Sequence, residues 1–229
     1  RFPKNDKVEG VVSYILGDTI VHLLKEYGFD KNVDLLKIDI DSFDCFVMNK
    51  ILSAGIRPRA IVMEINVKFP SHIRFALYPG YDEAGTQIPF DSEKRGHLYG
   101  CSLGFQLDDV MHPHGYEIYY MDWNNVLYID KRKKKSFVKL RTDRKKWYDF
   151  GYWERPDRDK AFGFNKDIKH WNSMDKETLA HEIQSKLMPM SSYVSHHVKL
   201  NKDHYCFDSE GFLYKDSKNK TACSKQTPK

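Results

Sequence analysis

The stretch from Asp34 to Val67 constrains the fold most, because it has the pattern of a strand, a helix and a second strand. Residues 33–41 and 59–66 are short, mostly apolar runs that end in polar side chains, as strands covered on both faces of a parallel sheet do. Between them, apolar residues recur at helical spacing, and Asp41 or Ser42 is suited to cap the start of this helix. The stretch therefore predicts a right-handed βαβ unit.

Four polar side chains follow these two strands. Asp39 and Asp41 end the first run, and Glu64 and Asn66 end the second. Ligands of open α/β sheets bind outside the carboxyl ends of the strands, so we expect the four to line one crevice. Carboxylate and amide oxygens suit Mg²⁺ or Ca²⁺, which makes all four candidate metal ligands. The structural alternative is that Asp41 only caps the helix and that Glu64 pairs with a nearby Lys or Arg.

A candidate catalytic histidine lies in the region that follows. Residues 68–96 are rich in Pro and Gly and predict a long loop, of the kind that often forms a lid or a binding loop. His97 comes next, and its imidazole could act as a base or a ligand if the loop folds over the crevice, although a single loop histidine usually does neither. The candidate catalytic residues are therefore Asp39, Asp41 and His97.

The rest of the first 131 residues completes an α/β domain. Residues 18–28 predict a helix with one apolar face, and a second helix opens at residues 99–102. Residues 116–123 and 125–130 predict a closing antiparallel strand pair. A sheet of this kind leaves the edge strand of the βαβ unit unpaired, so we expect a missing N-terminal segment or a partner protein subunit to cover that edge.

From residue 132 to residue 229 the chain becomes basic and aromatic, with a polar end that predicts disorder. Basic and aromatic residues together can bind single-stranded nucleic acid, but we favour an extension that wraps the sheet and buries its rings. Its charge run at residues 131–135 and its scattered Pro and Gly make it a poor source of paired strands.

The four cysteines are Cys45, Cys101, Cys206 and Cys223, without the spacing of a zinc ribbon or a disulfide framework. We therefore expect a reducing, intracellular compartment, either cytoplasmic or organellar. A secreted origin is the alternative, because Cys206 and Cys223 could pair and Asn219 begins a glycosylation sequon. No apolar run reaches the roughly 20 residues of a transmembrane helix, and no signal peptide is visible.

The order of these elements resembles the second half of a class I methyltransferase sheet, which is Rossmann-like and mostly parallel with a closing antiparallel strand. The run Asp34-Leu-Leu-Lys-Ile-Asp-Ile-Asp41 is similar to the hallmark of FkbM-type methyltransferases, with Ser42 in place of a glycine. The resemblance continues through residues 57–59, 63–66 and 96–102 and covers roughly residues 10–130.

This resemblance implies O-methyl transfer from S-adenosylmethionine to a small-molecule or sugar acceptor. It also implies Mg²⁺, because metal-dependent catechol-type methyltransferases use acidic and amide side chains that would match Asp39 or Asp41, Glu64 and Asn66. The family's glycine-rich turn is absent from this chain, so no residue is assigned to the cofactor. The cofactor half would lie upstream or on another chain, or has been lost. A non-catalytic accessory subunit of a larger assembly is the alternative function.

Overall fold

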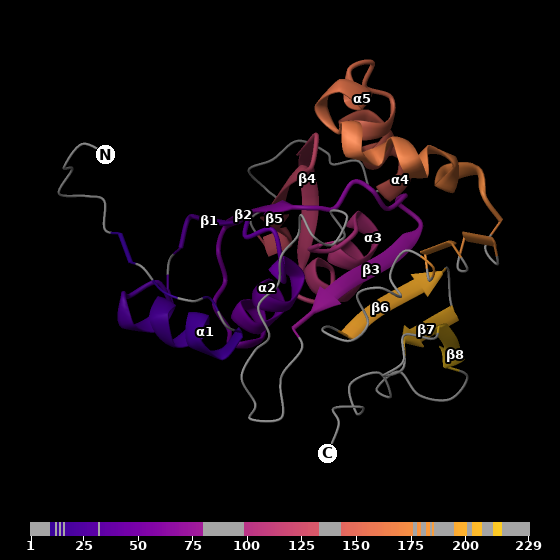
Figure 1. The fold of residues 1–229 in the computed structure, drawn as a ribbon. Coiled ribbons are helices and arrows are strands. Elements are labelled where there is room, and N and C mark those ends of the chain that lie inside the picture. Colours follow the sequence, from indigo (N-terminus) through magenta and orange to yellow (C-terminus); the bar gives the residue numbers. More distant parts are fainter. Residues whose placement is uncertain are drawn as a thin grey trace.

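The computed structural model describes residues 10–11, 13, 15, 17–31, 33–79, 99–132 and 143–175, together with residues 178–179, 182–183, 185, 195–200, 203–207 and 213–216. Within these residues the chain forms two four-stranded sheets with helices packed around them (Figure 1). The protein is therefore a mixed α/β protein, as the sequence predicts.

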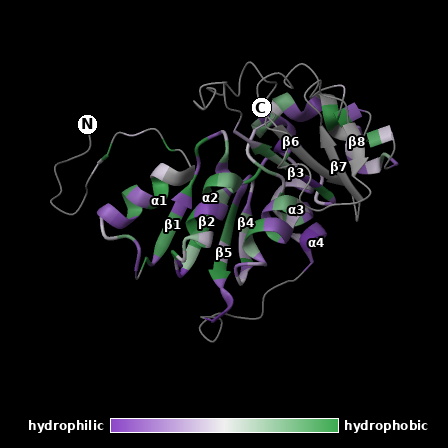
Figure 2. Cartoon of the chain, turned by 90° about the horizontal axis from the view of Figure 1, so that it is seen from below, coloured by the Kyte–Doolittle hydropathy of each residue, from purple (hydrophilic) through white to green (hydrophobic). Residues whose placement is uncertain are grey.

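The first sheet contains the predicted βαβ unit. Strand β1 (Leu35–Ile38) lies parallel to β2 (Ala60–Glu64), so the predicted adjacent parallel strands are confirmed. Strand β5 (Asn125–Asp130) pairs antiparallel with β2 on one side and with β4 (Tyr116–Asp122) on the other. The strand order is β1-β2-β5-β4, and Figure 2 shows these strands side by side. Strands β1, β2 and β4 point the same way and β5 points the opposite way, so the closing antiparallel pair is also confirmed.

Three helical segments flank this sheet. Helix α1 (Gly17–Glu26) precedes β1 and helix α2 (Asp44–Ser53) connects β1 to β2, both as predicted. Helix α3 (Leu103–Phe105) continues as the π-helix η2 (Gln106–Met111), and the Ser102 side chain caps its start by accepting a hydrogen bond from the Phe105 amide. The helix opened by residues 99–102 is therefore also confirmed.

One face of the sheet is buried against the helices. Ile61 of β2 pairs with Tyr128 of β5, and Met63 pairs with Val126, so these four side chains share one face, and all four are fully buried. The same core includes apolar residues of α2 and η2, namely Val47, Met48, Ile51, Leu52, Leu107, Val110 and Met111. Val62 of β2 faces the other way and is only partly buried, so the burial expected on both faces is incomplete among the described residues.

The second sheet was not predicted. It joins β3 (Ile73–Tyr78) to β6 (Ser195–Leu200), β7 (Asp203–Phe207) and β8 (Leu213–Asp216), all antiparallel and in that order. The expectation of a long loop over residues 68–96 is therefore wrong where β3 lies. The expectation that the extension is a poor source of paired strands is also wrong, since β6, β7 and β8 belong to it. The pairing of β6 with β3 depends on contacts between residues far apart in the sequence, which local pattern does not reveal.

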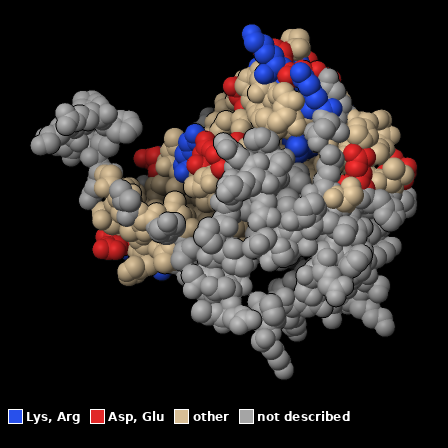
Figure 3. Space-filling model, viewed as in Figure 1, with Lys and Arg blue, Asp and Glu red and all other residues tan. Residues whose placement is uncertain are grey.

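Helices make up the rest of the described extension. They are α4 (Arg144–Tyr148), the π-helix η4 (Asp149–Trp153), α5 (Arg158–Ala161) and the 3₁₀ segment η5 (Gly163–Ser173). Several of their rings are buried as expected, including Trp147, Tyr148 and the fully enclosed Trp171, whereas Phe150 and Phe164 are exposed. Basic side chains gather at the end of the molecule that α5 forms (Figure 3). No helix among the described residues is long and apolar enough to cross a membrane.

A disulfide joins Cys45 in the first turn of α2 to Cys101, which precedes α3. The cysteine spacing did not indicate this bond. The two cysteines are 56 residues apart in the sequence, and only the fold brings them together. The possible pairing of Cys206 with Cys223 lies outside the described side chains.

Candidate functional site

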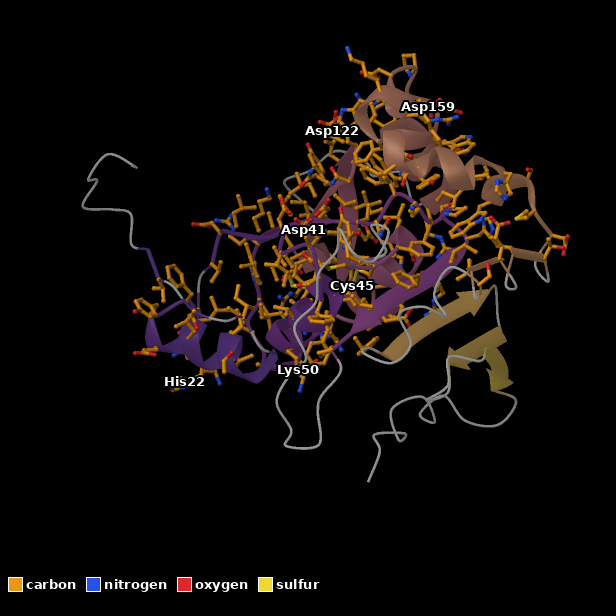
Figure 4. All side chains as sticks on the ribbon, viewed as in Figure 1. His22, Asp41, Cys45, Lys50, Asp122 and Asp159 are labelled. Carbon is orange, nitrogen blue, oxygen red and sulfur yellow. A yellow bond between two sulfur atoms is a disulfide. The ribbon has the colours of Figure 1, made fainter. Side chains whose placement is uncertain are left out.

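Three carboxylates meet where β1 and β2 end. Asp39 and Asp41 follow β1, and Glu64 is the last residue of β2. Because the strands are parallel neighbours in register, their carboxyl ends lie at the same edge of the sheet. One carboxylate oxygen of each residue lies within 4.8 Å of the others. We call these residues the acidic cluster, and Figure 4 shows Asp41 near the centre of the molecule, beside the start of α2.

Glu64 is the buried member of the acidic cluster, with a relative exposure of 7%. Its Oε1 accepts hydrogen bonds from the Tyr99 hydroxyl at 3.3 Å and from the Asn124 side-chain amide. Burial raises the pKa of Glu64 to about 8, and the neighbouring Asp39 and Asp41 carboxylates add to the rise. Without a cation, Glu64 is therefore mostly protonated at neutral pH.

The pKa of Asp39 is shifted in the opposite direction, below its ordinary value. Its Oδ2 lies 2.8 Å from the Lys37 ammonium, and both side chains are partly exposed. This hydrogen bond is the main cause of the lowered pKa of Asp39 and of the raised pKa of Lys37. Burial therefore favours the proton on Glu64, and the Lys37 hydrogen bond favours the negative charge on Asp39.

A fourth acidic residue, Asp44, shapes the turn that presents Asp41. Its buried carboxylate accepts hydrogen bonds from the Ile40 amide at 3.0 Å and the Ser42 amide at 3.2 Å. Asp41 has a φ of 50°, a left-handed conformation that Asp tolerates better than most residues. The prediction that Asp41 or Ser42 caps α2 is wrong: the cap residue is Phe43, whose ring has no atom that can accept a hydrogen bond.

Asn66 lies beside the acidic cluster, but its side-chain amide forms hydrogen bonds with backbone groups. The side-chain nitrogen donates to the Tyr99 carbonyl at 3.0 Å, and the side-chain oxygen accepts from the Lys68 amide at 3.0 Å. The Asn66 backbone amide also donates to the Cys101 carbonyl at 2.8 Å. Asn66 therefore holds the segment that carries Tyr99 over Glu64.

The segment of residues 99–102 ties both sheets to the site. The Gly100 amide donates to the Ser42 carbonyl at 2.7 Å, and the Leu77 amide of β3 donates to the Gly100 carbonyl at 2.9 Å. One residue further, Cys101 forms the disulfide with Cys45, which is next to Asp44. The disulfide thus joins the turn that presents Asp41 to the segment that presents Tyr99.

His97, the predicted loop base, lies outside the described residues. Three residues that shape the site were not predicted, namely Asp44, Tyr99 and Asn124. Asp44 lies in the same acidic stretch as Asp39 and Asp41, so the sequence did carry a signal for it. Asn124 lies in the tight turn between β4 and β5, and no local pattern connects such a turn to Glu64.

A cavity lies apart from the acidic cluster. It has a volume of about 570 Å³ and is lined by residues of η2, α4 and the segment before β3, including His72 and His112. Arg144 at its wall is paired with Asp108 at 2.6 Å. Burial lowers the pKa of both His72 and His112, and so keeps these rings mostly neutral at pH 7. Nothing in this arrangement selects a ligand of one charge.

The donor set of the acidic cluster fits a divalent cation. Its ligands are carboxylate oxygens, which are the donors that Mg²⁺ and Ca²⁺ prefer. A cation at this position would compete with the proton on Glu64 and offset the repulsion among the three carboxylates. The described residues that would hold it are Asp39, Asp41 and Glu64.

Comparison with known proteins gives no relative for this chain: no family model, no curated protein and no solved structure matches it. The resemblance to FkbM-type methyltransferases therefore stays a prediction.

Proposed function

We propose that this chain is the acceptor-binding half of a class I, FkbM-like methyltransferase domain. It would take part in O-methyl transfer from S-adenosylmethionine to a hydroxyl of a small molecule or sugar. The observation that carries the proposal is the acidic cluster, because it lies at the carboxyl ends of adjacent parallel strands, where α/β enzymes bind their ligands.

The sheet supports the same proposal. The resemblance implies a mostly parallel sheet closed by an antiparallel strand, and here β1, β2 and β4 share one direction while β5 runs the other way. Fold alone does not establish an activity, so the proposal depends on what the site can bind.

The proposal includes a further segment at β1. Among the described residues β1 pairs only with β2, and Leu35 on this edge strand is 59% exposed. An apolar groove of about 370 Å³ runs along β1 between α1 and α2, lined by residues that include Leu36, Ile38 and Ile20. An upstream segment or a partner subunit that carries the glycine-rich turn would cover this edge and bring the cofactor to the acidic cluster.

Each cluster residue has a distinct part in the proposed chemistry. Asp39, Asp41 and Glu64 would hold Mg²⁺, which when bound lowers the pKa of a coordinated acceptor hydroxyl. Tyr99 and Asn124 fix the Glu64 carboxyl by their hydrogen bonds, so it needs no rearrangement when the acceptor arrives. Asp39, which its hydrogen bond with Lys37 keeps charged, would act as a ligand of the cation and not as a base.

Titration with S-adenosylmethionine tests the enzymatic proposal. The chain alone should give no binding heat, because it has no glycine-rich turn. The same chain joined to the polypeptide or subunit that covers β1 should bind S-adenosylmethionine and melt at a higher temperature in its presence. A completed protein that shows neither heat nor thermal stabilisation would exclude this function.

The second candidate is a non-catalytic subunit of a larger assembly. It is favoured by the hydrogen bonds that Glu64 already receives from Tyr99 and Asn124, since a satisfied network of this kind can be purely structural. A completed protein that transfers the methyl group would exclude this candidate, and one that does not bind S-adenosylmethionine would support it.

A further inference from the structure

The Cys45–Cys101 disulfide lies in the protein core. The residues are 1% and 0% exposed, and their Cα atoms are 6.0 Å apart, within the usual range for a bridged pair. Around them the backbone is already paired, since Ala76 of β3 forms an antiparallel bridge with Cys101. The fold therefore holds the two cysteine backbones at a separation that a disulfide spans.

Other uses of this cysteine pair do not fit. The metal-ligating cluster found among the described residues consists of carboxylates and contains neither cysteine. Redox-active cysteines are partly exposed and often close together in sequence, whereas these two are buried and 56 residues apart. The disulfide is therefore a structural one, and it ties together the two segments that present Asp41 and Tyr99.

We infer that the working form of this chain is the disulfide-bonded one, and that it folds in an oxidising compartment. Structural disulfides form and persist in such compartments, whereas cytosolic thiol systems keep cysteines reduced. Formation of the bond removes two protons and two electrons from the two thiols, and a protein disulfide of the compartment accepts them and becomes a dithiol. This inference replaces the reducing compartment expected from the cysteine spacing.

The sequence contains a second, independent feature that is typical of proteins from an oxidising compartment. Asn219-Lys-Thr221 is an N-glycosylation sequon, three residues beyond the end of β8. N-glycans are added to secreted proteins, so a glycan on Asn219 would identify the oxidising compartment as part of the secretory pathway.

Thiol trapping in the native protein tests the inference. Cells that produce the protein are quenched in denaturing acid, and free thiols are alkylated with a first reagent. The protein is then reduced and alkylated with a second reagent, and its cysteine peptides are identified by mass spectrometry. Cys45 and Cys101 should carry only the second label. A first label on both cysteines would overturn the inference, whatever the state of Asn219.

Two controls make the result decisive. In a Cys45→Ala variant, Cys101 has lost its partner and should take the first label, which shows that the buried position is accessible under the quench. Peptide N-glycosidase treatment should shift the mass of the Asn219 peptide, and Asn219→Gln should abolish that shift. Protected thiols without a glycan would still support an oxidising compartment, because a sequon can remain unmodified. This test does not depend on whether the acidic cluster binds a cation.

Discussion

Removing the disulfide should destabilise the chain strongly. Cys45 and Cys101 are 56 residues apart, and closing a loop of that length removes unfolded-state entropy worth about 4 kcal/mol at 25 °C. The double variant Cys45→Ala/Cys101→Ala should lose about this much free energy of unfolding, since both side chains are small and leave little cavity. For a chain of this size the melting temperature should fall by roughly 8 to 16 °C.

Urea unfolding with and without a thiol reductant measures this effect. The wild-type protein in reductant should match the double variant, and the double variant should not respond to reductant. A Cys223→Ala variant is the control, because it removes a cysteine outside this pair. Equal stability of wild-type protein and double variant under oxidising conditions would refute the reasoning, because the bond would then add nothing to the fold.

Three further predictions concern single residues. The pKa of Glu64 in the folded protein, about 8, exceeds its ordinary value of 4.5, so the folded state binds a proton more tightly than the unfolded state. The stability of the wild-type protein should therefore fall relative to that of Glu64→Gln as the pH rises from 4.5 to about 8. Urea unfolding at a series of pH values measures this difference. A Cβ at Gly104 would lie 2.5 Å from a backbone oxygen of β3, so Gly104→Ala should cost about 1 to 3 kcal/mol, whereas Gly163→Ala, with no atom within 4 Å, should change stability little. The Ser102 hydroxyl makes three buried hydrogen bonds, so Ser102→Ala should cost about 1 to 3 kcal/mol, against almost no change for the exposed Ser53→Ala.

Local pattern predicted the first sheet well. The apolar runs that became β1 and β2, the helix between them and the hairpin of β4 and β5 each have a clear period, tight polar boundaries and a short connection. The position of Asp39, Asp41 and Glu64 then followed from the geometry of parallel strands. These elements are determined by residues close together in the sequence, and such local patterns can be read from a single sequence.

Long-range contacts could not be predicted. Strand β3 pairs with β6, more than a hundred residues later, so its six residues gave no local sign of a partner. The disulfide likewise joins cysteines from two segments that only the tertiary fold brings together. The hydrogen bonds of Asn66 could not be predicted for a related reason, because their partners belong to a turn and a segment whose positions depend on the fold.

Calorimetric titration of Mg²⁺ into this chain tests the central claim most directly. The account predicts binding accompanied by proton release near pH 7, because the cation displaces the proton from Glu64. Glu64→Gln should weaken the affinity at least about tenfold, or about 1.4 kcal/mol, whereas Asp34→Asn, at an exposed ion pair with Arg59, should leave it unchanged. Absence of Mg²⁺ binding to the wild-type chain, or equal affinity in wild-type protein and Glu64→Gln, would contradict the assignment of the acidic cluster as a cation site.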